Sequence, residues 1–177
     1  MSTKKSDKEK EKIIAKSEDT MDDAAKEPLD HPDVPMLPPI VFLLFLIGGL
    51  VLDWLMPINF GHGWGAFGLI LLIGALGVIA WCNMIFEKAG TNISPEKPSL
   101  TIIKEGPYAY SRNPIYVCFL VAYLGLAMLA DAPVMILLTG ALFFVLGKYV
   151  IQREEEYLEA TFGEEYLDYK SKVGRWF

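Results

Sequence analysis

The stretch IYVCFLVAYLGLAMLADAPVMILLTGALFFVLGKYVI, residues 115–151, contains two apolar runs that carry almost no charge. The runs, 115–130 and 133–151, are separated only by the turn Asp131-Ala132-Pro133. At about 1.5 Å per residue, a helix made from either run spans roughly 24 to 28 Å, close to the hydrocarbon thickness of a bilayer. The turn is too short to do more than reverse the chain, so we predict an antiparallel helical hairpin.

Two more apolar runs, residues 37–56 and 64–86, precede the hairpin, and 53% of the 177 residues are hydrophobic. A soluble helical bundle would show a polar stripe at 3.6-residue spacing, and none of the four runs has one. We therefore predict an all-α, polytopic integral membrane protein with about four transmembrane helices. Its membrane domain comprises residues 37–177 and includes a C-terminal helical hairpin followed by cytoplasmic helices.

Residues 1–36 have a different composition, rich in Lys, Glu, Asp and Ser with scattered apolar residues. So little apolar surface cannot offset the entropy lost on ordering, and we predict a disordered cytoplasmic tail. The segment lacks the apolar stretch after a basic start that is typical of a secretory signal peptide. Its acidic and basic residues are mixed, which argues against a nucleic-acid-binding arm.

Basic residues near the ends of the apolar runs predict the orientation of the chain, because Lys and Arg favour the cytoplasmic side of a membrane. The connections 57–63 and 131–133 contain no Lys or Arg. In contrast, the tail, the segment 87–113 and the segment from Lys148 onward each contain several. We predict four spans with both termini in the cytoplasm.

Polar residues lie at both ends of the predicted hairpin, in SRNPIY (residues 111–116) and IQREEEYL (residues 151–158). Both ends emerge on the same side of the membrane, and packed helices sit about 8 to 10 Å apart. We therefore expect the two segments to meet. The residues expected to converge are Arg112, Asn113, Tyr116, Arg153, Glu154 and Glu155.

Simple structural roles also fit these segments. Pro114 favours the first turn of a helix, and tyrosine and arginine are common at membrane interfaces. The C-terminal segment fits an amphipathic helix, broken at Gly163, whose apolar face would lie on the membrane. That face comprises Tyr157, Leu158, Phe162, Tyr166 and Tyr169. Consecutive glutamates at a hairpin mouth nevertheless require a cationic partner, supplied either by Arg112 and Arg153 or by a ligand.

The string GWGAFG, residues 63–68, matches the GxGxxG pattern of dinucleotide-binding loops, with Glu87 about twenty residues further on. That pattern has meaning only between a strand and a helix of a βαβ unit. Here it begins an apolar run. We therefore interpret these glycines as loop flexibility and close helix packing, together with Gly74 and Gly77.

Cys82 and Cys118 lie inside apolar runs and form no CxxC pair, and His31 and His62 are distant from them in the sequence. Cysteine in such a position is commonly a small buried hydrophobic residue. We expect no metal site.

Two blocks of residues on either side of the hairpin carry a family resemblance. They are GPY-x-Y-x-R-x-P-x-Y (residues 106–116) and R-E-E-x-x-L-x-x-x-F-G-x-x-Y-x-x-Y (residues 153–169). Together they resemble the isoprenylcysteine carboxyl methyltransferase and phospholipid methyltransferase superfamily of integral membrane proteins. The resemblance covers about residues 81–177 and implies that the membrane domain is methyltransferase-like.

The resemblance implies that S-adenosylmethionine binds at the cytoplasmic end of the hairpin. The implied cofactor-binding residues are Tyr108, Asn113, Pro114, Tyr116, Glu154 and Glu155, and the implied catalytic residues are Arg112, Arg153 and Glu155. Carboxylates suit ribose hydroxyls and positive charge, and tyrosines contact apolar or cationic groups. The best-known members have histidine where this chain has Asn113. An amide can position a cofactor but carries no proton near neutral pH.

The implied reaction is methyl transfer to a lipophilic, membrane-associated acceptor that enters the site from the surrounding lipids. A carboxylate acceptor, such as an isoprenylcysteine, needs no base, and Arg112 or Arg153 would position it. A phospholipid amine must first lose a proton, so Glu154 or Glu155 would act as the base. The sequence leaves both acceptors open.

Two other functions fit parts of the sequence. Related membrane reductases carry a similar C-terminal hairpin and use NADPH, although they generally have more spans. A non-catalytic membrane scaffold or lipid-binding protein would instead recruit a partner through residues 1–36.

Overall fold

The computed structural model describes residues 31–59, 61, 63–94 and 96–177. Most of the predicted disordered tail, residues 1–30, lies outside the described residues, as does His62. The part of the tail that is described packs against the protein: Pro32 is buried, and Val34 contacts the hydrophobic core. The described residues form helices joined by loops and contain no strand, which confirms the all-α prediction.

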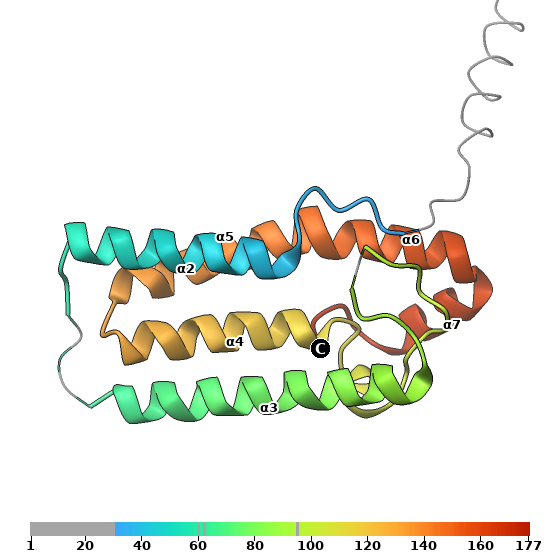
Figure 1. Cartoon of the computed structure of the whole chain (residues 1–177), viewed down its shortest axis with the longest axis horizontal. Helices are drawn as coiled ribbons and strands as arrows, with labels where there is room; N and C mark the ends of the chain where they lie inside the picture. The colour runs from blue at the N-terminus through green and yellow to red at the C-terminus, as the bar shows by residue number, and fades with distance from the viewer. Residues whose placement is uncertain (1–30, 60, 62, 95) are drawn as a thin grey trace, which may run out of the picture.

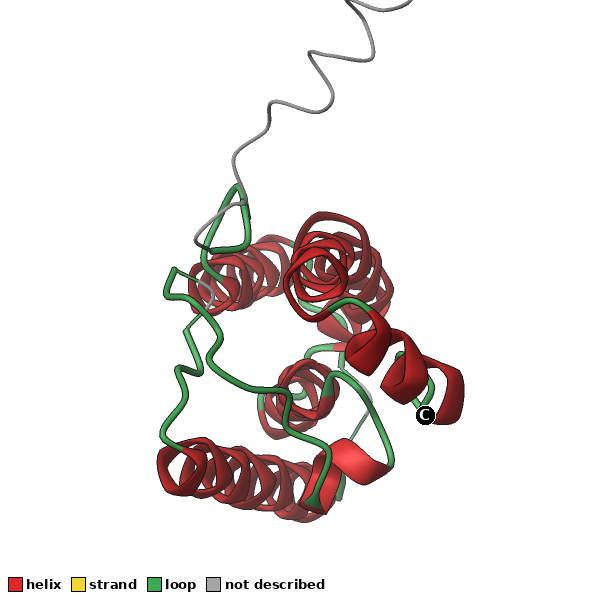
Figure 2. Cartoon of the chain, turned by 90° about the vertical axis from the view of Figure 1, so that its right-hand side faces the viewer, coloured by secondary structure: helices red, strands yellow, loops and turns green. Residues whose placement is uncertain are grey.

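Four helical segments run side by side along the length of the molecule (Figure 1). They are α2 (Pro38–Leu55), α3 (Gly65–Ala89), α4 (Pro114–Leu129) and a segment that begins with α5 (Pro133–Val145). Helix α4 packs against both α3 and α5, and α5 packs against α2. Figure 2 looks along this bundle from the end where loops and short helices gather, which we call the polar end.

The helix lengths suit a membrane protein. Within the described residues, three helices are long and apolar enough to cross a bilayer: α2, α3 and the continuous helical rod Pro133–Phe162. The fourth apolar helix, α4, is shorter, with 16 residues. It spans about 24 Å at about 1.5 Å per residue, and it lies between α3 and α5 in the bundle.

The predicted antiparallel hairpin is confirmed as α4 and α5. Asp131 adopts a left-handed backbone conformation with φ 52°, and the Ala132 amide donates to the Ala127 carbonyl at 2.9 Å, so the chain reverses within the predicted turn. Pro114 and Pro133 each stand at the start of a helix, where a missing N–H costs nothing. The two polar ends of the hairpin therefore lie at the same end of the bundle.

The second leg of the hairpin continues beyond the apolar run. A π-helical turn, η2 (Leu146–Ile151), joins α5 to α6 (Gln152–Phe162) without a break. Helix α6 ends at Gly163, which has φ 52°, and α7 (Glu164–Lys172) folds back from it. A π turn rotates the following residues relative to a regular α-helix, and such turns are frequent at functional sites.

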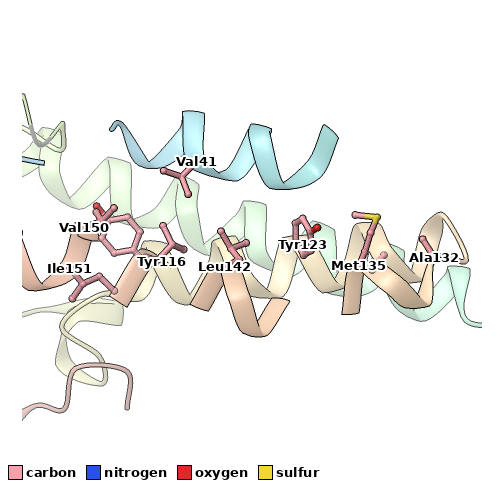
Figure 3. Close-up of a cluster of buried hydrophobic side chains, with 10 residues drawn as sticks. Val41, Tyr116, Tyr123, Ala132, Met135, Leu142, Val150 and Ile151 are labelled. Atoms are coloured by element: carbon pink, nitrogen blue, oxygen red, sulfur yellow. The ribbon is translucent and has the colours of Figure 1, made fainter. Parts of the chain in front are cut away.

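The largest hydrophobic core lies along the hairpin and beneath α2 (Figure 3). Tyr123 and Met135 are fully buried within it, and the Tyr123 hydroxyl donates to the Phe45 carbonyl at 2.9 Å. The labelled core residues come from α2, α4, the Asp131 turn, α5 and η2: Val41, Tyr116, Tyr123, Ala132, Met135, Leu142, Val150 and Ile151. The same core therefore reaches from the turn to Tyr116, beside the polar end.

Close packing of α3 against α4 depends on one glycine from each helix. A Cβ placed on Gly68 would lie 2.6 Å from the Gly125 carbonyl oxygen, and one on Gly125 would lie 2.7 Å from the Gly68 carbonyl oxygen. The interpretation of Gly68 as a packing residue is thus confirmed. For Gly74 and Gly77 it is wrong, because a Cβ on either would meet no atom within 4 Å.

Candidate functional site

A cavity lies at the polar end, between the loop of residues 90–105, the short helix η1 (Gly106–Ala109) and the starts of α4 and α6. It contains about 820 Å³ of empty space, which includes a part open to solvent. Its polar and aromatic lining includes Tyr108, Arg112, Asn113, Tyr116, Glu154, Glu155, Tyr157, Tyr166 and Tyr169. All nine residues lie within the two sequence blocks, and all but Asn113 and Tyr157 stand at named positions of the motifs.

The start of α4 meets the start of α6, as predicted. The Tyr116 hydroxyl donates to Glu154 Oε1 at 2.5 Å, and the Asn113 side-chain amide donates to Glu155 Oε1 at 3.3 Å. Asn113 is the residue just before α4 and Tyr116 lies in its first turn, so both stand at the start of α4. Their partners are adjacent on α6, and the two contacts together fix how α6 is rotated against α4.

Glu155 is held by two arginines. Arg112 Nε and Nη2 donate to Oε1 at 3.0 and 2.9 Å, and Arg175 Nε and Nη2 donate to Oε2 at 3.1 and 2.7 Å. The carboxylate is buried, with 3% of the residue exposed. Both oxygens therefore have charge-assisted partners, which is the arrangement a buried carboxylate requires.

Arg112 is occupied on its other side as well. Its Nη1 donates to the carbonyl oxygens of Lys170 and Val173 at 3.1 and 2.9 Å. Its own backbone amide donates to the Gly174 carbonyl at 3.0 Å. The guanidinium thus joins the residues just before α4 to α6, to the end of α7 and to the segment after it.

Glu154 has a different environment from its neighbour. Its carboxylate lines the cavity and accepts the Tyr116 hydroxyl, but it forms no ion pair with any Lys or Arg in the described part of the chain. A carboxylate in such a place attracts a cationic group. Of the two adjacent glutamates, Glu155 is neutralised within the protein and Glu154 faces the cavity.

Asn113 occupies the N-cap position of α4, yet its side chain does not cap the helix. Its amide donates to the Arg175 carbonyl at 3.1 Å in addition to Glu155. The Asn113 side chain therefore makes two contacts that hold the start of α4 against α6 and against the segment after α7. Neither contact needs a titratable proton.

Tyrosines form an aromatic wall of the cavity. Tyr157, Tyr166 and Tyr169 are buried, so the alternative in which they face the membrane is wrong. The Tyr169 hydroxyl donates to the Tyr108 carbonyl at 2.7 Å, which ties α7 to η1. Burial raises the pKa of Tyr169 to about 12 and raises that of Tyr108 further, so both hydroxyls stay protonated near neutral pH.

The loop that covers the cavity is attached to the C-terminal helices. The Ser99 amide donates to the Tyr157 hydroxyl at 3.2 Å, and Lys104 pairs with Glu165 at 2.8 Å. Residues 99 and 101–103 of this loop line the cavity directly. The site therefore has a wall from a segment that the sequence did not predict to be part of it.

The structure brings together most, though not all, of the predicted site residues. Arg153 is exposed and does not line the cavity, and Pro114 is buried as the first residue of α4 without lining it either. The second cation beside Glu155 is Arg175, which sequence analysis missed. It stands twenty residues after Glu155, and no motif or helical periodicity links the two positions.

Comparison with known proteins gives a family match and several related proteins. A model of the phospholipid methyltransferase family matches residues 64–165, more than half of the chain. The cobalt-zinc-cadmium resistance protein CzcN of Cupriavidus metallidurans is 27% identical over 128 residues, which cover 67% of this chain and 55% of that protein.

Two protein-S-isoprenylcysteine O-methyltransferases match a shorter region. That of Saccharomyces cerevisiae is 37% identical over 76 residues, and that of Schizosaccharomyces pombe is 41% identical over 75 residues. Each match covers 41% of this chain and 30% of the relative. The chain thus spans about half, or less, of the length of these curated relatives. The family match covers α3, the hairpin and α6, so this chain belongs to the phospholipid methyltransferase family.

Proposed function

We propose that this protein transfers a methyl group from S-adenosylmethionine to a lipophilic, membrane-associated acceptor. The observation that carries the proposal is Glu154, a carboxylate in the cavity that has a hydroxyl partner and no ion pair among the described residues. Family membership supports a methyl transfer reaction, and the apolar bundle supports an acceptor that resides in the membrane.

The residues of the cavity fit the proposed methyl donor, which supplies a methyl group already activated on a positively charged sulfonium. Glu154 offers the negative charge that favours this cation, and Tyr116 holds the carboxylate in place. Faces of Tyr108 and Tyr157 suit the flat or cationic parts of the ligand. The loop of residues 99–103 forms one wall of the cavity. Alignment of the methyl donor with its acceptor in such a site can supply several kcal/mol of rate enhancement.

The contacts around Arg112 and Glu155 change the roles assigned to them. Both guanidinium edges of Arg112 are occupied by Glu155 and main-chain carbonyls, so we propose that it positions the site instead of binding a carboxylate acceptor. Glu155 is likewise occupied by two arginines and acts as a positioning residue. If the acceptor is an amine, Glu154 is the candidate base.

Calorimetric titration of the detergent-purified protein tests the proposal, with S-adenosylmethionine and S-adenosylhomocysteine as ligands and NADPH as the control. The two adenosyl ligands differ in the methyl group and its positive charge. Glu154→Gln is expected to weaken S-adenosylmethionine binding by about 1.5 to 3 kcal/mol, and S-adenosylhomocysteine binding by less. Binding of NADPH alone would favour a reductase. No binding by a folded protein would favour a scaffold.

A further inference from the structure

We infer that residues 173–177 act as a clasp across the mouth of the hairpin, and that Arg175 in this clasp is a positioning residue for the cofactor site. This inference rests on the proposed function. It assigns a role to a segment that lies outside the region matched by the family model. The clasp acts through Glu155 and the start of α4 on the wall made by Tyr116 and Glu154.

The clasp is attached to the α4 start mainly through backbone carbonyls. The Gly174 carbonyl accepts the Arg112 amide at 3.0 Å, and the Arg175 carbonyl accepts the Asn113 side chain at 3.1 Å and the Ser111 hydroxyl at 3.4 Å. The Val173 carbonyl accepts Arg112 Nη1 at 2.9 Å. Residues 111–113 are therefore held from one side by the clasp.

Two side chains of the clasp reach the second leg of the hairpin. Arg175 forms an ion pair with Glu155 on α6 at 2.7 Å, and Trp176 stacks on Phe143 of α5 with ring centroids 4.5 Å apart. Along this leg, Phe143 precedes the π turn η2 and Glu155 follows it. The clasp thus bridges both legs of the hairpin, and Figure 1 shows the end of the chain beside the start of α4.

The position of Glu155 determines the position of Glu154. The two residues are adjacent on α6, so a rotation of α6 that displaces one displaces the other by the same angle. Arg112 and Asn113 hold Oε1 of Glu155 from α4, whereas Arg175 holds Oε2 from the opposite side. Without Arg175, Oε2 of Glu155 loses its cationic partner. The rotation of α6 is then less restrained, and so is the position of Glu154 beside Tyr116.

The test uses Arg175→Gln in the full-length protein, with Lys172→Gln as the matched control. Lys172 is an exposed cation three residues away, whose ion-pair partner is Asp168. We expect Arg175→Gln to raise the Kd for S-adenosylhomocysteine about tenfold, the effect of losing a charge-assisted contact, and Lys172→Gln to leave it unchanged. Arg175→Lys, which keeps a cation beside Oε2, is expected to recover part of the loss.

The calorimetric Kd separates positioning from a merely structural role. A variant that is only less stable has fewer functional sites but an unchanged Kd. In the double variant Glu155→Gln/Arg175→Gln, the Kd is expected to stay within about twofold of Glu155→Gln alone, because Arg175 acts through Glu155. Equal Kd values for Arg175→Gln and Lys172→Gln would overturn the inference while leaving the proposed function intact.

Hydrogen exchange without any ligand tests the clasp independently of the proposed function. In Arg175→Gln, the Arg112 amide is expected to exchange about tenfold faster than in Lys172→Gln, because the clasp that accepts its hydrogen bond is loosened. Unchanged exchange would contradict the clasp. If the wild-type protein binds no adenosyl ligand, the proposed function fails, and this exchange measurement still decides whether the clasp exists.

Discussion

Glu155→Gln is the most informative perturbation of the site's stability, because it removes a charge and keeps the shape. Glu155 accepts hydrogen bonds from two nitrogens of Arg112, two of Arg175 and the Asn113 amide. A carboxamide offers one acceptor oxygen, and its NH₂ group would face one of the two guanidinium groups. One arginine therefore loses its hydrogen-bond acceptor. The other keeps an acceptor oxygen, but that oxygen no longer carries the negative charge that compensates for the burial of the guanidinium.

The structure sets the size of the effect. Breaking a buried ion pair typically costs about 3 to 5 kcal/mol. Arg112 keeps its two carbonyl acceptors, and the Arg175 side chain is 40% exposed, so water can solvate it. We therefore expect a loss near the lower limit, about 3 kcal/mol.

Reversible unfolding in SDS, followed by tryptophan fluorescence, measures this loss. Glu159→Gln is the matched control on the same helix, because Glu159 pairs with Lys170 at 2.7 Å and both side chains are well exposed. An exposed pair contributes only about 0 to 1 kcal/mol. If both variants lose the same small free energy, Glu155 does not form the buried ion pairs described here.

Three further predictions concern packing, pH and the loop over the cavity. Gly68→Ala is expected to destabilise the protein by about 1 to 3 kcal/mol, because the added Cβ would meet the Gly125 carbonyl. Gly77→Ala is expected to be neutral or stabilising, because its Cβ would meet no atom within 4 Å. Unfolding in SDS compares the stability of the two variants. Burial holds the pKa of Tyr169 at about 12 in the folded protein, against 10.0 for an exposed tyrosine, so thermal stability should fall as the pH rises between these values; in Tyr169→Phe the fall should be smaller. Tyr157→Phe removes the acceptor of the Ser99 amide, so hydrogen exchange at Ser99 should quicken, and an unchanged rate would show that the loop is held elsewhere.

Much of the fold could be predicted from the sequence because its signals are local. Long apolar runs, the turn at Asp131 and Pro114 at a helix start determine the hairpin, and the hairpin in turn brings Tyr116 to Glu154. The extent of the last leg could not be predicted, since a polar segment continues the helix through a π turn to Phe162.

The missed features depend on contacts between distant parts of the chain. Arg175 reaches Glu155 only because α7 and the following residues fold back, and neither spacing nor composition indicates that path. Nothing in the sequence distinguishes Gly68, where a Cβ would meet α4, from Gly77, where a Cβ would meet no atom within 4 Å, because both lie in the same apolar run. The different roles of Glu154 and Glu155 likewise follow from which cations lie nearby.

Transfer of a labelled methyl group tests the central claim most directly. The protein in lipid nanodiscs is incubated with methyl-labelled S-adenosylmethionine, a lipid extract and a farnesylated cysteine derivative, and the organic phase is counted before and after treatment with base. We predict protein-dependent label in the organic phase that is reduced in Glu154→Gln; base releases it as methanol from a carboxyl ester but not from a methylated amine. Absence of label in the organic phase, from folded protein that binds S-adenosylmethionine, would contradict methyl transfer to a lipophilic acceptor.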